Sequence, residues 1–486
     1  MVHDNLGRKI VFLLSLLMFA TVNLYAAVPV HINSGNPAFP FPQFLEYSCG
    51  GNLGTKLPVG LSHAEMEQQI RQAYQQHVYA FEYTGEEWAG IKYIKGNIGC
   101  PYDCTEGDGY ALLAAAYMAD KVTFDGLWMR IHDLRRVHTK RYSDCTDNNP
   151  DYEYGDHSMR DGDANRQSES AADGDEDVAL ALYVAYKQWG EFMLDAEGNK
   201  VLDACDNPIS YKQELLDVVQ GLVGISTRFD KEEIKQRMLS GMIGLDGYVK
   251  GGNTYPEVSN WASQEENYLE LQGVTMSPEF AGSYKCHTDY LAPAYYNEFY
   301  ELLKQNKDQQ DDIASFEIEQ FRRGEASSDW LIGKLISKNE HILPMAGNHT
   351  LSEGDGEPIF EAFSEGEDFR APWRTISNYV WHGNSKYSWN PVTHAVIDSS
   401  NTYEYDAAVR LSSYLKDPAH WNEEAGTECW SLNTNRDLYV SSPWTVAWNI
   451  NFETGKNNSS SIFTNWTSGV SSFAAVGSQD YDLMGQ

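Results

Sequence analysis

The sequence has little positive charge. It carries 36 lysine and arginine residues against 70 aspartate and glutamate residues, so its formal net charge is −34 at pH 7. Nucleic-acid binding depends on lysine and arginine side chains that neutralise phosphates, so this balance argues against a nucleic-acid partner. Strong negative charge alone mostly indicates a solvated surface.

Long apolar runs are also missing beyond the N-terminus. No later run reaches the roughly 18 residues that would span a membrane. The chain instead begins like a secretory signal peptide, with Arg8 and Lys9, an apolar stretch at 10–20, and alanines at positions 26 and 27. We expect residues 1–26 to be removed and the protein to be secreted, extracellular or periplasmic, with no membrane partner afterwards. A retained N-terminal anchor is the alternative.

Metal-binding motifs are absent as well. The sequence has neither a CxxC pair nor an HExxH segment, which are typical of zinc sites. A calcium loop starting at Asp161 or Asp173 fails, because its sixth and twelfth positions lack the required glycine and glutamate. The seven cysteines fit a secreted chain with disulfides, in which Cys100 and Cys104 could pair and the odd number leaves one over. We predict no metal and no cofactor.

The chain does contain a succession of helical patterns. Residues 27–60, rich in proline, glycine and asparagine, predict an irregular N-terminal arm. Beyond this arm apolar residues recur at helical spacing, and strand patterns are scarce. The predicted helices are 63–79, 106–119, 124–138, 177–190, 210–224, 289–305, 311–321 and 370–382.

Long loops rich in glycine, aspartate, asparagine and tryptophan separate these helices, notably at 139–172, 245–280 and 340–369. Many helices joined by long loops predict an all-α toroid in residues 61–486, with the loops forming a cleft at one end. The tail at 430–486 has the pattern of an interrupted helix, so this domain is either truncated at its C-terminus or ends in a short helix.

One stretch, AADGDEDVALALYVAYKQW at 171–189, places four acids within 173–177. Acids at a helix start each stabilise the helix by about 0.3–1 kcal/mol. The spacing of the apolar residues behind them indicates one buried helix face. A capped helix explains only part of the acid run, because neighbouring carboxylates repel one another. A catalytic cleft is the remaining explanation.

A second stretch, CTEGDGYALLAAAYMAD at 104–120, predicts a helix that Thr105 caps and that carries Glu106 in its first turn. Gly107 and Gly109 each cost about 0.8–1 kcal/mol of helix propensity against alanine. They would let another group, such as a sugar ring, approach closely. In the plainer interpretation, Glu106 only stabilises the helix start.

Together these stretches resemble a known family. TEGDGY, FDGLW at 124–128 and the acid run look like the hallmarks of glycoside hydrolase family 8, and DYLAPAYY at 289–296 and FRAPWR at 369–374 are similar to two further family segments. The resemblance covers roughly 60–430. It implies an (α/α)6 barrel of inner and outer helices that cleaves β-1,4-linked polymers with inversion.

The resemblance also implies roles for individual residues. Glu106 matches the general acid, and Asp173 matches the carboxylate that holds the distorted sugar in the central subsite. Tyr290 matches the tyrosine that helps to hold the attacking water. Asp175 is expected to lie beside the substrate in support of Asp173.

The general base is less well defined. Family members with an aspartate base carry it three residues before the arginine of a D-A-x-R segment, and here that position before Arg370 holds Glu367, with Asp368 next to it. Another family branch takes a glutamate base from an inserted loop, so the glutamates of 340–369 remain candidates. An inverting base must lie about 6.5–9.5 Å from the acid, leaving room for a water.

Flat aromatic faces are needed to bind sugars, and aromatic residues make up 13% of the chain. Trp128 and Trp373 lie in the matched segments and are candidate sugar platforms, as are Trp381 and Trp389 nearby. A core position is the alternative for each of them.

Two arginines, Arg370 and Arg374, flank Trp373. They could order the base or bind sugar hydroxyls. Alternatively they pair with the acids.

The sequence thus predicts a secreted, monomeric, inverting glycoside hydrolase whose partner is a polysaccharide, with β-1,4-glucan favoured (an endoglucanase). A xylanase, either endo-acting or reducing-end exo-acting, and a chitosanase are the alternatives. Because position 367 holds glutamate where the family pattern has an aspartate base, a non-catalytic carbohydrate-binding homologue is a further alternative. A cell-surface interaction protein with an acidic toroid is a third reading.

Overall fold

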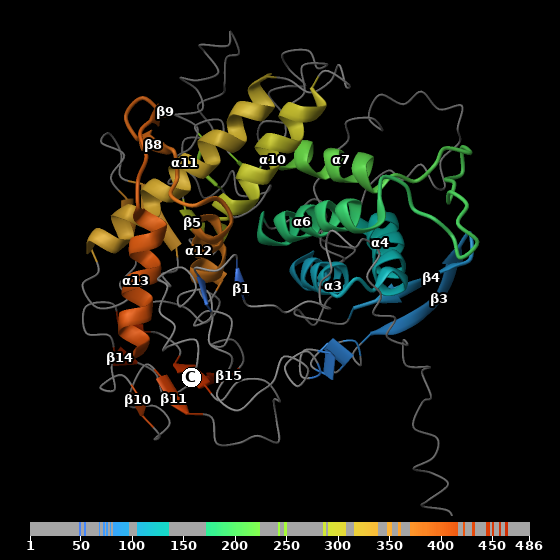
Figure 1. Cartoon of the computed structure of the whole chain (residues 1–486), viewed down its shortest axis with the longest axis horizontal. Coiled ribbons are helices and arrows are strands. Elements are labelled where there is room, and N and C mark those ends of the chain that lie inside the picture. Colours follow the sequence, from blue (N-terminus) through green and yellow to red (C-terminus); the bar gives the residue numbers. More distant parts are fainter. Residues whose placement is uncertain are drawn as a thin grey trace, which may run out of the picture.

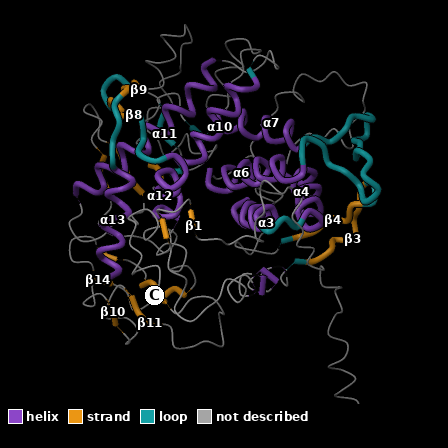
Figure 2. The backbone as a smooth tube through the Cα atoms, in the orientation of Figure 1, coloured by secondary structure: helices purple, strands orange, loops and turns teal. Residues whose placement is uncertain are grey.

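The computed structural model describes six continuous segments of the chain, 81–96, 105–135, 172–223, 290–307, 315–338 and 370–416, together with scattered positions and short pieces elsewhere. The described part is mostly helical (Figures 1 and 2). Within it, no helix combines the length and the hydropathy needed to cross a bilayer. The predicted signal peptide at 1–26 and most of the predicted arm at 27–60 lie outside the described residues.

The main helices form consecutive pairs, and the two helices of each pair pack on one another. They are α3 (Thr105–Tyr117) with α4 (Lys121–Arg135), α6 (Ala172–Trp189) with α7 (Tyr211–Val223), α10 (Pro293–Asn306) with α11 (Ser315–Lys338), and α12 (Arg370–His382) with α13 (Tyr403–Lys416).

These pairs are arranged in two rows. The first helices of the pairs form one row, in which α3 packs on α6 and α10 packs on α12. The row is continued between α6 and α10 by a hydrogen bond of 2.8 Å from the Tyr183 hydroxyl to Glu298. The second helices form the other row, in which α11 contacts both α7 and α13. Figure 1 shows α6 lying between α3 and α10.

Short strands flank the helices. The hairpin of β3 (Glu82–Trp88) and β4 (Ile91–Lys95) packs on α4, and the hairpin of β8 (Tyr387–Asn390) and β9 (Ala395–Asp398) packs on α11. The remaining strands are β1 (Ser48–Cys49) and β2 (Leu53–Gly54), the sheet of β5 (Lys285–His287), β6 (Asn348–Leu351) and β7 (Pro358–Phe360), the sheet of β10 (Trp421–Asn422), β11 (Trp430–Leu432), β12 (Trp444–Ala447) and β15 (Ile462–Thr464), and the pair β13 (Ile450–Asn451) and β14 (Lys456–Asn457).

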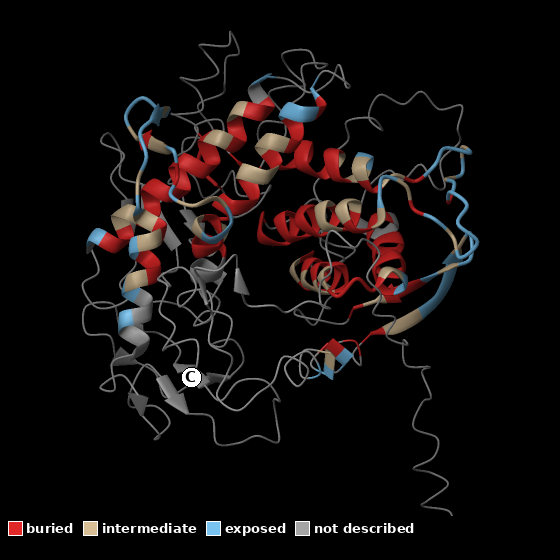
Figure 3. Ribbon diagram, in the orientation of Figure 1, coloured by how far each residue is buried: buried red, intermediate tan, exposed pale blue. Residues whose placement is uncertain are grey.

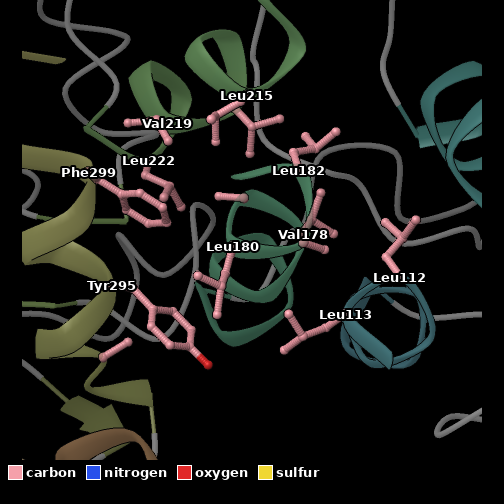
Figure 4. Close-up of a cluster of buried hydrophobic side chains, with 14 of the residues drawn as sticks. Leu112, Leu113, Val178, Leu180, Leu182, Leu215, Val219, Leu222, Tyr295 and Phe299 are labelled. Carbon is pink, nitrogen blue, oxygen red and sulfur yellow. The ribbon is translucent and has the colours of Figure 1, made fainter. Parts of the chain in front are cut away.

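Helix α6 is the centre of the core. Every residue from Ala172 to Leu182 is buried, so the helix is enclosed on all sides over this length and not only on the apolar stripe that its sequence predicts (Figure 3). Apolar side chains of α3, α7 and α10 surround it (Figure 4). The labelled members of this cluster are Leu112, Leu113, Val178, Leu180, Leu182, Leu215, Val219, Leu222, Tyr295 and Phe299.

The helix boundaries agree with the sequence patterns to different degrees. Helix α12 has the predicted bounds, and α3 and α7 lie within about two residues of them. Helix α6 begins five residues earlier than predicted, so the acid run lies inside the helix. Helix α11 extends to Lys338, well beyond the predicted end at 321, because buried polar residues such as Ser328 and Asp329 interrupt its apolar pattern.

Candidate active site

The first turns of α3 and α6 are pressed together at glycines. A Cβ atom on Gly174 would lie 2.7 Å from the backbone nitrogen of Glu106 and 2.8 Å from Cβ of Thr105. A Cβ atom on Gly109 would lie 2.9 Å from Cβ of Asp177. Only glycine fits at either position, so the two helix starts meet through their backbones.

This contact corrects one expectation from the sequence. Gly109 was expected to make room for a group such as a sugar ring, but the space beside it is filled by Asp177 and the carbonyl oxygen of Gly174, 3.0 Å away. The glycine is there for helix packing. Its consequence for the site is indirect, because close packing brings Glu106 next to the residue that follows Asp173.

The four acids of the run are all buried: Asp173, Asp175, Glu176 and Asp177 are each at most 1% exposed. Burying charges without a partner is unfavourable, so opposite charge must lie close by. Arg374 of α12, itself fully buried, supplies it for Glu176 and Asp177. Its Nη1 donates to Glu176 at 2.7 Å, and its Nη2 donates to Asp177 at 2.8 Å and to the carbonyl oxygen of Asp173 at 3.0 Å. Pairing of Arg374 with the acids is thereby confirmed.

Glu176 extends this network to α10. Its other carboxylate oxygen accepts a hydrogen bond from the Tyr296 hydroxyl, which lies 3.3 Å from the carbonyl oxygen of Tyr290. Burial raises the pKa of Glu176 to about 8, while the neighbouring Arg374 and Tyr296 act to lower it. The ionised form of Glu176 therefore depends on the arginine beside it.

Glu106 differs from the acid run in being partly exposed. It lies in the first turn of α3, as predicted, and its Oε1 accepts a hydrogen bond of 3.1 Å from the Tyr110 hydroxyl one turn later. Asp108 in the same turn is buried and lies 3.9 Å from Arg130 of α4. The Glu106 carboxylate is thus oriented by a hydrogen bond from Tyr110, and the residue remains partly exposed.

The predicted base candidates, Glu367 and Asp368, lie outside the described residues. Arg370 and Trp373 are in the first turn of α12, although their side chains are likewise outside the described part. Tyr290 precedes α10 and is partly buried against the core. The structure therefore brings together α3 and α6, which carry Glu106 and Asp173, with α10, which Tyr290 precedes, and α12.

Trp128 is not a sugar platform. It is 0% exposed and packs edge-on against His132 of the same helix, with ring centroids 5.6 Å apart. Trp389 is also in the core, whereas Trp381 is 39% exposed and stacks on Tyr295. Trp128 and Trp389 therefore occupy core positions, which is the alternative to a sugar platform.

The FDGLW motif that contains Trp128 serves packing. Asp125 accepts hydrogen bonds from Lys121 and from the Tyr211 hydroxyl of α7. A Cβ atom on Gly126 would lie 2.6 Å from the carbonyl oxygen of Lys92 in β4. The motif thus fits α4 between α7 and the β3–β4 hairpin.

Metal-binding and redox groups are few in the described part of the chain. Among the described residues, no cluster of three or more histidine, cysteine, aspartate and glutamate side chains could hold a metal ion. Cys205 is disulfide-bonded. The Cys100–Cys104 pair considered from the sequence lies outside the described residues.

Two features were not anticipated from the sequence. Glu176 and Tyr296 complete the network around Arg374. Both residues lie in motifs that resemble the family, but nothing in those motifs marks them as partners of an arginine. A second group of buried acids, Glu325 and Asp329 of α11 with Glu404 of α13, lies elsewhere in the helical rows. Glu404 is distant in sequence from Glu325 and Asp329, so no motif reveals the group.

Comparison with known proteins agrees with the motifs. Residues 95–210, the segment that holds α3, α4 and α6, match the family model of glycosyl hydrolases family 8. By sequence, no curated protein matches the chain.

Two solved structures share the fold. The apo structure of a β-1,3-1,4-glucanase from Paenibacillus sp. X4 is 14% identical, with 93% of this chain and 91% of that chain covered and a TM-score of 0.53. A double mutant of Rex8A from Paenibacillus barcinonensis is 13% identical, with 87% and 85% covered and a TM-score of 0.50.

Proposed function

We propose that the protein is a secreted inverting glycoside hydrolase that cleaves β-1,4 bonds in a polysaccharide. The observation that carries this proposal is the contact between the starts of α3 and α6, which places the accessible Glu106 next to the backbone that follows Asp173. Both residues lie in the segment that matches glycosyl hydrolases family 8.

In the proposed reaction two carboxyl groups suffice, and no cofactor takes part. Glu106 protonates the leaving glycosidic oxygen, while Glu367 or Asp368 removes a proton from a water that attacks the opposite face of the sugar. Asp173 holds the distorted ring, and Tyr290 helps to place the water. The product that carries the newly formed reducing end is released with the inverted anomeric configuration, and the other fragment leaves with the proton from Glu106 on its oxygen.

The complete fold is proposed to be the (α/α)6 barrel. The four described helix pairs, with their first helices in one row and their second helices in the other, are consistent with such a barrel. The scattered described positions between 68 and 78 are helical as well, which agrees with the predicted helix at 63–79. We propose that residues 61–486 form a single catalytic domain.

The favoured substrate is β-1,4-glucan, with xylan and chitosan as alternatives. The similar structure from Paenibacillus sp. X4 is of a β-1,3-1,4-glucanase, so mixed-linkage glucan belongs among the substrates to test. The experiment is reducing-end release from carboxymethyl-cellulose, mixed-linkage β-glucan, xylan and chitosan, with the anomer of the first product determined by NMR. Release of the inverted anomer from one polymer supports the proposal. Binding without release would instead indicate a carbohydrate-binding homologue.

Secretion as a monomer is also proposed. The disulfide at Cys205 supports an oxidising compartment, because disulfides persist mainly outside the cytosol. N-terminal sequencing of protein recovered from the medium or periplasm tests cleavage near residue 26, and light scattering tests the monomer. A mature chain that still begins at Met1 would contradict the signal peptide.

A further inference from the structure

Arg374 contacts three acceptors at the start of α6 at once. One guanidinium nitrogen donates to the Glu176 carboxylate, and the other donates to the Asp177 carboxylate and to the backbone carbonyl of Asp173. The arginine is fully buried and so are both carboxylates. A planar group with several donors in a fixed geometry is suited to hold three acceptors in one arrangement, which a lysine ammonium is not.

The other partners of Glu176 and Arg374 lie on α10. Glu176 accepts a hydrogen bond from Tyr296, whose hydroxyl lies 3.3 Å from the carbonyl oxygen of Tyr290. The Arg374 guanidinium also lies over the Tyr295 ring, 5.7 Å from its centroid. One buried group of side chains therefore connects α6, α10 and α12.

The start of each of these helices is close in sequence to a residue of the proposed site. Asp173 is in the first turn of α6, Tyr290 lies just before α10, and the base candidates Glu367 and Asp368 directly precede α12. Glu106 is joined to α6 by the contact of its backbone with Gly174. The position of Glu106 and Asp173 relative to Tyr290 therefore depends on how the start of α6 is held against α10 and α12.

We propose that Arg374 and Glu176 are a positioning pair that holds the start of α6, and with it Asp173 and Glu106, against α10 and α12, without touching the substrate themselves. The inference rests on the proposed function and deepens it. Because a general acid must lie within hydrogen-bond reach of the oxygen that it protonates, a small shift of the α6 start, and of Glu106 with it, reduces turnover. A misplacement of about 1 Å is enough for a loss of about 100-fold.

Two substitutions test the pair. Arg374→Lys keeps the positive charge but cannot reach all three acceptors, and Glu176→Gln keeps the shape of the side chain but removes its charge. Arg323→Lys is the matched control. Arg323 is a similarly buried arginine of α11 that donates to Gln320 at 2.6 Å and to the carbonyl oxygen of His394 at 3.1 Å.

The readouts are kcat and KM on the polysaccharide that the wild-type protein cleaves, together with the melting temperature of each variant. We expect kcat to fall at least tenfold in Arg374→Lys and in Glu176→Gln, with KM within about twofold, and kcat to be unchanged in Arg323→Lys despite a comparable loss of melting temperature. A purely structural role of Arg374 predicts the same kcat in all three. In addition, the double variant Arg374→Lys/Asp173→Asn should lose less kcat than the product of the two single losses, because Arg374 acts through the position of Asp173.

The outcomes separate the inference from the proposed function. No release by the folded wild-type protein rejects the proposed function, and the inference with it. An active wild-type protein whose Arg374→Lys variant keeps its kcat rejects the inference alone. If Arg374→Lys does not fold, Glu176→Gln decides: a normal kcat in that variant overturns the positioning role, and a tenfold loss with unchanged KM supports it.

Discussion

Gly174 and Glu106 are in contact across two helices: a Cβ atom on Gly174 would lie 2.7 Å from the backbone nitrogen of Glu106. Cβ atoms do not approach other heavy atoms so closely, so the contact exists only because position 174 is glycine. The relative position of Glu106 and Asp173 is therefore determined by backbone packing between α3 and α6, and not by flexible side chains.

Substitution of Gly174 by alanine is expected to separate these helix starts. Alanine gains about 0.8–1 kcal/mol of helix propensity, but overpacking against a backbone costs about 1–3 kcal/mol. We expect a net loss of stability in chemical denaturation and a lower kcat. Gly324→Ala in α11 is the control, because its nearest neighbour is the flexible end of Ile243, 3.1 Å away. A Gly174→Ala variant as stable and active as the wild-type protein would show that the contact is dispensable.

The register of the acid run is tested by comparing Asp173→Asn with Asp175→Asn. Both side chains are buried, so both variants are expected to lose some stability. Asp173→Asn should lower kcat strongly, because Asp173 is proposed to hold the distorted sugar, and Asp175→Asn should have a smaller effect. Kinetics on the cleaved polymer provide the measurement. The reverse order would mean that Asp175 is the residue that holds the sugar.

Trp128 is expected to matter for stability and not for substrate binding. Trp128→Phe removes buried volume and should cost less than the about 3–5 kcal/mol typical of a large aromatic replaced by alanine. Its KM should stay at the wild-type value, because no part of Trp128 reaches the surface. Urea denaturation and KM are measured together. A raised KM in a protein of wild-type stability would restore Trp128 as a sugar platform.

The buried acids of α11 and α13 are expected to make stability depend on pH. Burial raises the pKa of Glu325 from 4.5 to about 8, and burial also raises the pKa values of Asp329 and Glu404. A carboxyl whose pKa is raised by folding stabilises the folded state fully below its unfolded pKa, and this contribution is lost as the pH rises through the folded pKa.

The free energy of unfolding of the wild-type protein should therefore contain a component that falls between about pH 4.5 and pH 8. Glu325→Gln removes the titrating group, so its stability should fall less over this range. Glu319→Gln, on the same helix and more exposed, is the control. Equal slopes in wild-type protein and Glu325→Gln would show that Glu325 is ionised throughout.

The sequence predicts some features of this protein well because they depend on local patterns. Helix α12 has its predicted bounds because its apolar positions are regularly spaced, and Glu106 lies in the first turn of α3 as its motif indicates. The α11 extension was missed because buried polar groups mask its periodicity.

Other features depend on the pairing of helices that are distant in sequence. From the sequence, Gly109 is expected to let a group such as a sugar ring approach closely, because the sequence does not show that α6 fills the space beside it. The partners of Arg374 lie about 200 residues earlier in the chain, and only the packed structure shows that they converge on it.

The most direct test of the account is the turnover of Glu106→Gln against that of Glu319→Gln, measured as reducing-end release from the polymer that the wild-type protein cleaves. Loss of general-acid catalysis costs about 10²–10⁴-fold in rate, so Glu106→Gln should fall by that factor, with its fold intact by circular dichroism, while Glu319→Gln should match the wild-type protein. A folded Glu106→Gln variant with wild-type turnover would contradict the proposed catalytic role of Glu106.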